Sequence, residues 1–134
     1  MWGSAISVNL GGAFRLARAV YPHMRDRGSG SIINIPSLCR TLGKPNLIAY
    51  CTAKFGLDGF TRALAEEARP FGMRCNAVNP RGTATRLWAT THPGQDPTTV
   101  LQPIDVANVV LFRASDLSNY VTGQEIEVSL LTYR

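Results

Sequence analysis

The chain has 134 residues, of which 45% are hydrophobic, and a formal net charge of +5. This length suits one domain, and the composition is that of a soluble globular protein rather than a disordered one. No apolar run approaches the roughly 18 residues that a membrane span requires, and the first residues carry no secretory signal. We therefore expect a cytoplasmic protein without a membrane segment.

The basic charge comes from 12 arginines and two lysines, which are dispersed along the chain. Proteins that bind nucleic acids usually gather such residues in a patch or stripe, so we expect no nucleic-acid partner. Cys39, Cys51 and Cys75 form no C-x-x-C pair and are expected to be reduced, partly buried thiols. His23 and His92 have no companion at metal-ligand spacing, so we predict no metal site.

The first half of the chain alternates helix, strand and helix. Apolar residues recur every three or four positions from residue 2 to about residue 27, which predicts a helix that Pro22 should bend or loosen. The apolar run SIINI, residues 31–35, is typical of a strand covered on both faces. A loop rich in proline and glycine follows, and residues 48–69 again show helical spacing.

The second half continues the alternation. Residues 73–79 predict another buried strand, and a polar, turn-rich loop runs from about residue 80 to 102. Residues 103–116 predict a helix with proline and an acid in its first turn, and residues 125–131 a final strand. This order indicates parallel α/β units with right-handed crossovers, in which ligands bind at the carboxyl ends of the strands.

Tyr50 and Lys54 stand four residues apart in the second predicted helix and therefore share one face of it. An ammonium group about 4 Å away, at an effective dielectric constant near 20, favours the phenolate by roughly 4 kcal/mol. This corresponds to about three pKa units before desolvation reduces the effect. Such a tyrosine exchanges protons near neutral pH. An isolated pair of this kind is more often a plain amphipathic helix, so the surrounding residues decide its meaning.

The surrounding stretches resemble the short-chain dehydrogenase/reductase family over almost the whole chain. They are VNLGGAF with Asn9, GSGSIINIPS with Ser37, AYCTAK with Tyr50 and Lys54, NAVNP with Pro80, and YVTGQ. The resemblance implies that Asn9, Ser37, Tyr50 and Lys54 form a catalytic tetrad. It also implies NAD or NADP as the cofactor and a small carbonyl compound or alcohol as the substrate. The stretches GSGSIINIPS and YVTGQEIEV look most like members that reduce 3-oxoacyl thioesters or small alcohols and ketones.

The resemblance assigns a role to each residue of the tetrad. Tyr50 is the general acid in reduction, or the general base in oxidation. Ser37 orients the substrate oxygen, and Lys54 lowers the pKa of Tyr50 and hydrogen-bonds the nicotinamide ribose. Asn9 kinks its helix and holds a water that links Lys54 to solvent. The hydride comes from the cofactor.

The loop that begins at residue 80 is implied to hold the nicotinamide end of the cofactor through Pro80, Thr83 and Thr85. It reads Pro80-Arg81-Gly82 where the family usually has Pro-Gly, which places Arg81 to hinder the approach to the carboxamide.

Further along the same loop, Leu87 and Trp88 either form an apolar wall of the substrate cleft or anchor the loop to the core. In the second predicted helix, Gly56, Gly59, Ala63 and Ala53 permit close helix packing, either across the subunit interface that the resemblance implies or within the monomer.

The sequence departs from the family in its first part. The family opens with a strand, a glycine-rich turn and a helix whose N-terminus binds the cofactor pyrophosphate. No such turn occurs here, because Gly11 and Gly12 lie inside a helix. We therefore expect residues 1–134 to form a single, incomplete domain. Its fold is a partial Rossmann-like, doubly wound parallel sheet that lacks the N-terminal nucleotide-binding βαβ units.

An incomplete sheet leaves the predicted strand 31–35 with an open apolar edge. We expect a chain that is poorly stable alone and that forms a homo-oligomer or associates through this edge. Two functions stay open. The chain is the catalytic half of an NAD(P)-dependent oxidoreductase, or it is a truncated, non-catalytic fragment or interaction subunit that cannot bind the cofactor alone.

Overall fold

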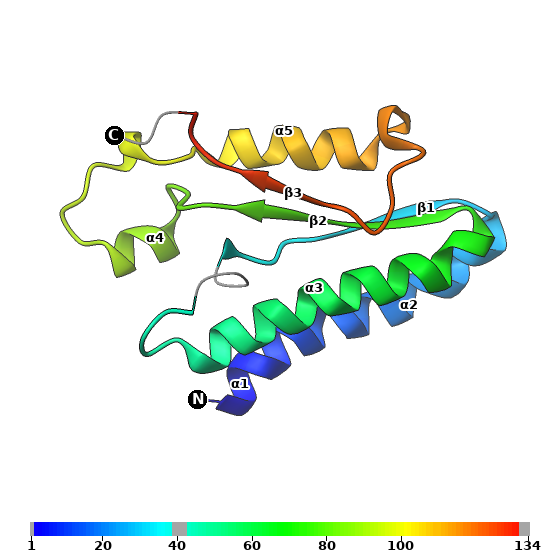
Figure 1. Cartoon of the computed structure of the whole chain (residues 1–134), viewed down its shortest axis with the longest axis horizontal. Coiled ribbons are helices and arrows are strands. Elements are labelled where there is room, and N and C mark those ends of the chain that lie inside the picture. The colour runs from blue at the N-terminus through cyan, green and yellow to red at the C-terminus, as the bar shows by residue number, and fades with distance from the viewer. Residues whose placement is uncertain (1, 39–42, 132–134) are drawn as a thin grey trace.

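The structure, a computed structural model, describes residues 2–38 and 43–131. Its strands form one parallel sheet in the order β1-β2-β3, with β1 at Gly30–Asn34, β2 at Met73–Pro80 and β3 at Glu125–Val128. Helices α2 and α3 cover one face of this sheet and α5 covers the other (Figure 1). The expected α/β class and parallel sheet are therefore confirmed.

The first helical segment has three parts: α1 at Trp2–Ile6, a π-helical turn at Ser7–Gly11 (η1), and α2 at Gly12–Arg27. Pro22 lies inside α2, which continues to its last turn, so the interruption predicted at Pro22 occurs instead at the π-helical turn. Gly28 ends α2 with φ of 71°, a left-handed conformation that glycine adopts without strain.

Helix α3 spans Ile48–Ala68, within one residue of its predicted end, and continues into a 3-10 turn at Arg69–Phe71 (η3). Gly72 then turns the chain into β2 with φ of 67°. A Cβ atom at this position would lie 2.5 Å from the carbonyl oxygen of Gly28. Only glycine therefore permits this close approach between the two turns that precede β1 and β2.

The predicted loop after β2 contains two short elements that the sequence patterns do not reveal. They are α4 at Arg86–Thr91 and a 3-10 turn at Pro97–Thr99 (η4). Helix α5 follows at Pro103–Ala114, two residues shorter than predicted. Its first turn is stabilised because the Asp105 carboxylate accepts a hydrogen bond of 2.7 Å from the backbone N–H of Gln102.

The core has two layers, because alternate residues of a strand point to opposite faces. On the α2–α3 face the buried cluster comprises Ala17, Leu64, Ala65 and Cys75. On the α5 face it comprises Val78, Leu101 and Val128, with Val106, Val109 and Val110 of α5 packed against it. Helices α3 and α5 thus make their crossovers on opposite faces while both step the same way across the sheet. These crossovers have opposite hands, so the prediction that all are right-handed is wrong for one of them.

Arg74 of β2 holds the carboxyl end of α5 to the sheet. Its guanidinium donates hydrogen bonds to the carbonyl oxygens of Arg113 at 2.8 Å and Ser115 at 3.2 Å, and to Ser118 Oγ at 2.7 Å. The hydroxyl of Ser31 in β1 donates to the same Arg113 carbonyl at 3.0 Å. A cation at this end of a helix also complements its dipole.

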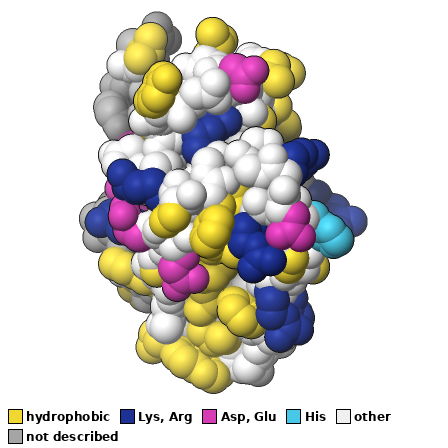
Figure 2. All heavy atoms as spheres, turned by 90° about the vertical axis from the view of Figure 1, so that its right-hand side faces the viewer, with side chains coloured by type: hydrophobic (Ala, Val, Ile, Leu, Met, Phe, Trp, Pro, Cys, Tyr) yellow, Lys and Arg dark blue, Asp and Glu magenta, His cyan; other side chains and the backbone are white. Residues whose placement is uncertain are grey.

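The surface seen in Figure 2 carries acidic and basic side chains interspersed across its middle, with apolar side chains gathered below them over the two-helix layer. None of the helices in residues 2–38 and 43–131 is both long and apolar enough to cross a membrane.

Candidate active site

Two strands of the sheet end side by side and deliver the candidate residues to one edge. Asn34, the last residue of β1, pairs with Ala77 of β2, which continues to Pro80. Ser37 follows three residues after the end of β1. The arrowheads of the strands in Figure 1 and the first turns of α3 lie at the same end of the molecule. This is the edge where parallel sheets bind ligands.

Lys54 links α3 to the end of β1. Its ammonium nitrogen donates a hydrogen bond of 2.9 Å to the carbonyl oxygen of Ile35, two residues before Ser37. The same nitrogen lies 5.5 Å from the centroid of the Tyr50 ring. The spacing of four residues thus places both side chains on one face, as the sequence predicts. That face is turned toward the end of β1, and Ser37 and Tyr50 are both half-buried there.

Asn9 lies in the π-helical turn η1. Its side-chain amide donates a hydrogen bond of 3.0 Å to the carbonyl oxygen of Ala5, four residues earlier. A π-helical turn shifts the backbone hydrogen bonds by one residue and so leaves carbonyl groups for other donors. Leu10, the next residue, packs on Gly56, where a Cβ atom would lie 2.9 Å from Leu10 Cδ2. The turn that carries Asn9 therefore lies against the part of α3 that carries Lys54.

Thr83 and Thr85 lie in the loop beyond β2, and both hydroxyl groups form hydrogen bonds within that loop. The Thr83 hydroxyl donates to the carbonyl oxygen of Arg81 at 2.9 Å. The Thr85 hydroxyl accepts a hydrogen bond of 3.2 Å from the backbone N–H of Trp88, which caps α4. A hydroxyl both donates and accepts, so each retains capacity for a ligand.

Arg81, the residue that departs from the family pattern, pairs with β3. Its Nε lies 2.8 Å from a carboxylate oxygen of Glu127, and its backbone N–H donates to the carbonyl oxygen of Val128 at 2.9 Å. Both contacts tie the start of the loop to the neighbouring strand. The ion pair holds the guanidinium beside β3.

Of the two apolar residues in the loop, Trp88 is the anchor. It is 7% exposed, and its ring stacks on His92 with centroids 5.3 Å apart. Leu87 is 66% exposed and remains a candidate for a cleft wall. The alternation of one buried and one exposed apolar residue follows from the helical path of α4.

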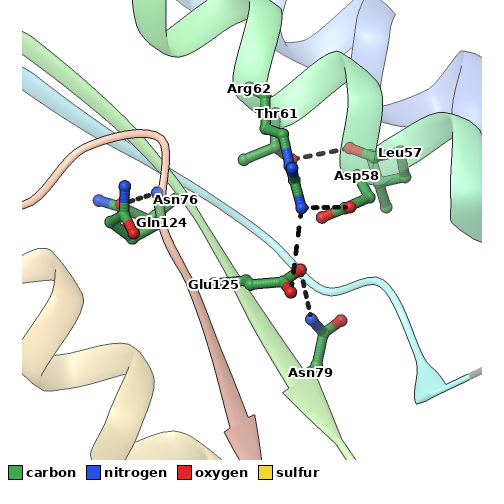
Figure 3. A network of polar contacts seen from close by, with 8 residues as sticks. All are labelled: Leu57, Asp58, Thr61, Arg62, Asn76, Asn79, Gln124 and Glu125. Carbon is green, nitrogen blue, oxygen red and sulfur yellow. Dashed lines mark hydrogen bonds and ion pairs between the residues drawn. The ribbon is translucent and has the colours of Figure 1, made fainter. Parts of the chain in front are cut away.

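Polar side chains inside the sheet form a network that the apolar strand patterns did not reveal. Asn79 of β2 donates to a carboxylate oxygen of Glu125 at 3.2 Å, and Arg62 lies 4.0 Å from the other oxygen. Arg62 also pairs with Asp58 at 3.2 Å, so α3 and the start of β3 are joined (Figure 3). Nearby, Asn34 donates to the Thr61 hydroxyl at 2.9 Å.

The signal that could have revealed this network is the presence of asparagines within β1 and β2, because a buried amide needs a hydrogen-bond partner. Asn79 precedes Pro80 and is fully buried. Its side-chain oxygen Oδ1 has no hydrogen-bond partner within the described part of the chain. The network therefore connects the carboxyl end of β2 to β3 and to α3.

Lys54, Tyr50 and the end of β1 meet at one edge of the sheet. No described segment forms a strand, glycine-rich turn and helix that would bind the pyrophosphate. Among residues 2–38 and 43–131, no three His, Cys, Asp or Glu side chains gather as metal ligands.

Two of the cysteines are buried within the described part of the chain. Cys51 and Cys75 are buried free thiols, and Cys39 lies outside the described residues. Burial raises the pKa of the Cys75 thiol to about 12, so it stays protonated.

Comparison with known proteins supports one family. The model of the family described as enoyl-(acyl carrier protein) reductase matches residues 1–129. The 3-oxoacyl-[acyl-carrier-protein] reductase FabG of Thermotoga maritima is 36% identical over 136 residues, which cover 95% of this chain and 55% of that protein.

Solved structures give the same result. A short chain dehydrogenase from Escherichia coli CFT073, complexed with NADPH, is 30% identical with a TM-score of 0.86, over 94% of this chain and 52% of that one. A 3-oxoacyl-[acyl-carrier protein] reductase with bound NAD from Brucella melitensis is 35% identical with a TM-score of 0.83, over 95% of this chain and 50% of that one. The chain thus spans about half the length of the relatives that it matches.

Proposed function

The chain belongs to the short-chain dehydrogenase/reductase family, and we propose that it supplies the catalytic half of an NAD(P)-dependent oxidoreductase. The observation that carries this proposal is the placement of Lys54 between the Tyr50 ring and the carbonyl oxygen of Ile35. This contact brings the tyrosine, the lysine and the serine-bearing strand end to one edge of the sheet.

Tyr50 is the group that moves a proton. In reduction its hydroxyl gives a proton to the substrate carbonyl oxygen, and in the reverse direction its phenolate takes the proton from the alcohol. The Lys54 ammonium stabilises the phenolate by its charge. Ser37 donates a hydrogen bond to the same substrate oxygen and fixes its orientation. The nicotinamide cofactor, when bound, supplies or accepts the hydride.

Asn9 and the residues after β2 support this step. We infer that Asn9, beside the α3 segment that carries Lys54, holds a water through which Lys54 exchanges protons with solvent. Pro80, Thr83 and Thr85 would hold the nicotinamide end of NAD or NADP. The ion pair of Arg81 with Glu127 favours this assignment, because it keeps the guanidinium on the β3 side of the loop.

The substrate class that we propose is a small carbonyl compound, with 3-oxoacyl thioesters as the first candidates. Two of the relatives named above are 3-oxoacyl-[acyl-carrier-protein] reductases. The exposed Leu87 on α4 offers an apolar contact next to the candidate nicotinamide residues.

A second function is supported by the length of the match. Because the chain spans about half of its relatives, it is alternatively a non-catalytic fragment or an interaction subunit that cannot bind the cofactor alone. Measurements of cofactor binding and turnover distinguish this non-catalytic function from the catalytic one.

We also propose that the chain forms a homo-oligomer through α2 and α3. A groove of about 450 Å³ lies between these helices and is lined by apolar side chains together with Arg18 and Glu67. In an interface around a two-fold axis every contact between the copies occurs twice, so an ion pair between Arg18 of one copy and Glu67 of the other would form twice. Gly59 and Ala63 of α3 are exposed and permit a close approach.

The test of the catalytic role is the variant Tyr50→Phe, which removes only the hydroxyl. We expect turnover of a 3-oxoacyl thioester with NADPH to fall about 10²- to 10⁴-fold, while NADPH binding is retained. Tyr120→Phe is the matched control, because Tyr120 is fully exposed on the loop before β3. Turnover that survives Tyr50→Phe contradicts the role of Tyr50, and absence of turnover from the unaltered protein favours the non-catalytic reading.

A further inference from the structure

Trp88 of α4 carries a hydrogen-bond donor that no described residue uses. The residue is 7% exposed, and the hydrogen bonds of the described chain include one from its backbone N–H but none from its indole N–H. Among residues 2–38 and 43–131, the fully buried side-chain atoms without a partner are Asn79 Oδ1 and Arg113 Nε, so the indole nitrogen is not enclosed. Trp88 therefore has a buried ring whose unpaired N–H reaches the surface, whereas buried tryptophans usually satisfy this group.

Gly82 leaves this N–H open. A Cβ atom at Gly82 would lie 3.4 Å from Trp88 Nε1 and 3.6 Å from Val100 Cγ1, so even a methyl group would stand over the donor. The glycine follows Arg81, whose guanidinium is held beside β3 by its ion pair with Glu127. The opening between Gly82 and Val100 thus combines one free donor with an apolar rim.

The sides of this opening are fixed by contacts within the loop. The backbone N–H of Leu101 donates to the carbonyl oxygen of Gly82 at 3.1 Å, and the Leu101 carbonyl oxygen accepts from the backbone N–H of Ala84 at 2.8 Å. Leu101 is itself buried in the core cluster on the α5 face. The His92 ring stacks on the indole with an angle of 11° between the two planes. The donor is therefore preorganised, which lowers the cost of binding a ligand.

The chemistry of the opening suits a neutral carbonyl oxygen. An indole N–H donates only and carries no charge, and within the described part of the chain no lysine or arginine lies over the Trp88 ring. Sites for phosphate or carboxylate groups use guanidinium or ammonium groups instead. The side chain of Val100 and the edge of the indole ring add apolar contacts for the carbon atoms beside such a carbonyl.

We propose that the Trp88 indole N–H binds the amide carbonyl oxygen in the thiol arm of a 3-oxoacyl thioester. In the proposed function the ketone oxygen is held by Tyr50 and Ser37, and the amide oxygen is the strongest acceptor that remains on such a substrate. Trp88 is thereby a specificity-determining residue that favours thioesters with an amide in the arm over those without one. The choice of a thioester rests on the proposed function, whereas the open N–H does not.

The test uses the indole N–H as its own probe. The chain has two tryptophans, so an isotope-labelled sample gives two indole N–H signals by NMR, and Trp2→Phe identifies the signal of Trp88. The full chain is titrated with S-acetoacetyl-N-acetylcysteamine, which carries an amide, and with S-ethyl acetothioacetate, which lacks one. We expect the Trp88 signal to shift with the first ligand, with a Kd in the millimolar range, and to stay unchanged with the second.

Two variants remove the donor in different ways. Gly82→Ala places a methyl group over the N–H at an ordinary van der Waals distance, and Trp88→Phe keeps an aromatic ring without the N–H. We expect each variant to weaken binding of the amide-bearing ligand about five- to tenfold, which corresponds to one neutral hydrogen bond. Gly59→Ala is the matched control, because a Cβ atom there meets nothing within 4 Å, and we expect it to leave binding unchanged.

The outcomes separate this inference from the proposed function. A Trp88 signal that never shifts overturns the inference, as does an equal shift with the ligand that lacks the amide or undiminished binding in Gly82→Ala. Turnover of S-acetoacetyl-N-acetylcysteamine with NADPH is measured in parallel. A shift without turnover leaves this inference standing and removes the proposed catalysis, whereas turnover without a shift removes this inference alone.

Discussion

Arg113 is a buried cation in the last turn of α5. Only 3% of the residue is exposed, and its Nε has no hydrogen-bond partner within the described residues. Burial, followed by the like charge of Arg74, lowers the pKa of Arg113. Its guanidinium carbon lies 6.0 Å from the centroid of the Phe112 ring, and no carboxylate among the described residues forms an ion pair with it. Because a buried charge without a counter-charge costs free energy, we expect this side chain to destabilise the chain.

We therefore expect Arg113→Met to stabilise the isolated chain by about 1 to 3 kcal/mol, since methionine keeps the length of the side chain without its charge. The midpoint of urea unfolding measures this effect. Arg86→Met is the matched control on an exposed helix position, where we expect a change below about 0.5 kcal/mol. A loss of stability in Arg113→Met contradicts the view that the guanidinium lacks compensation.

The buried Cys75 thiol makes the stability of the fold depend on pH. Its thiol has a pKa of about 12 in the folded chain, above the ordinary value of 9.0, because burial favours the neutral form. At pH values between these two, the unfolded chain has lost a proton that the folded chain keeps. The contribution of Cys75 to stability is therefore complete below about pH 9 and is lost as the pH rises toward 12.

The measurement is the free energy of unfolding from about pH 8 to about pH 10 in the unaltered protein and in Cys75→Ala. Above pH 9 we expect the free energy to fall more steeply in the unaltered protein, by about 1.4 kcal/mol per pH unit. Equal slopes in the two proteins would show that the thiol does not govern this range.

At the scale of elements, α3 contains two glycines in different surroundings. A Cβ atom at Gly59 would meet nothing within 4 Å, whereas at Gly56 it would lie 2.9 Å from Leu10 Cδ2. Glycine in a helix interior costs about 0.5 to 1 kcal/mol relative to alanine. Gly56 therefore permits the contact of α3 with the turn that carries Asn9, and Gly59 has no such role within the chain.

We expect Gly59→Ala to stabilise the isolated chain by about 0.5 to 1 kcal/mol, and Gly56→Ala to gain less or to lose stability because Leu10 must move. Thermal unfolding at concentrations that keep the chain monomeric compares the two variants directly. A larger gain for Gly56→Ala than for Gly59→Ala is the result that contradicts this packing.

The sequence patterns predict the long elements well and the short ones poorly. Residues 48–69 and 73–79 end within one residue of α3 and β2, because a continuous apolar pattern and clear turn residues define them. Helix α4 escapes prediction because a helix of six residues depends on its tertiary anchor, the buried Trp88. Strand β3 ends at Val128 rather than at residue 131, since its partner β2 ends opposite it at Pro80.

In the candidate site, too, local features can be predicted from the sequence, whereas contacts between distant segments cannot. The spacing of Tyr50 and Lys54 within one helix is legible in the sequence, and so is the position of Ser37 after a strand. The contact of Lys54 with Ile35 and the ion pair of Arg81 with Glu127 join segments that are 19 and 46 residues apart. Such contacts depend on the register of the sheet, which no local pattern encodes.

At the scale of the whole molecule, the chain is half of a doubly wound sheet. The described residues include the candidate catalytic residues and the residues that we propose to contact the nicotinamide, and the relatives are about twice as long. Among the described residues, β1 and β3 each pair only with β2, so the sheet has two open edges. A sheet of three strands buries less apolar surface than a longer one, so we expect the stability of this chain to be modest.

We propose that this chain is the catalytic half of a nicotinamide-dependent oxidoreductase. Titration with NADH and NADPH, followed by nucleotide fluorescence and thermal stability together, tests it most directly. The chain is measured alone and with the amino-terminal half of a relative. We predict micromolar binding and a raised melting temperature in the mixture, with far weaker binding to the chain alone. Absence of binding in both samples, from folded and associated protein, would contradict the claim.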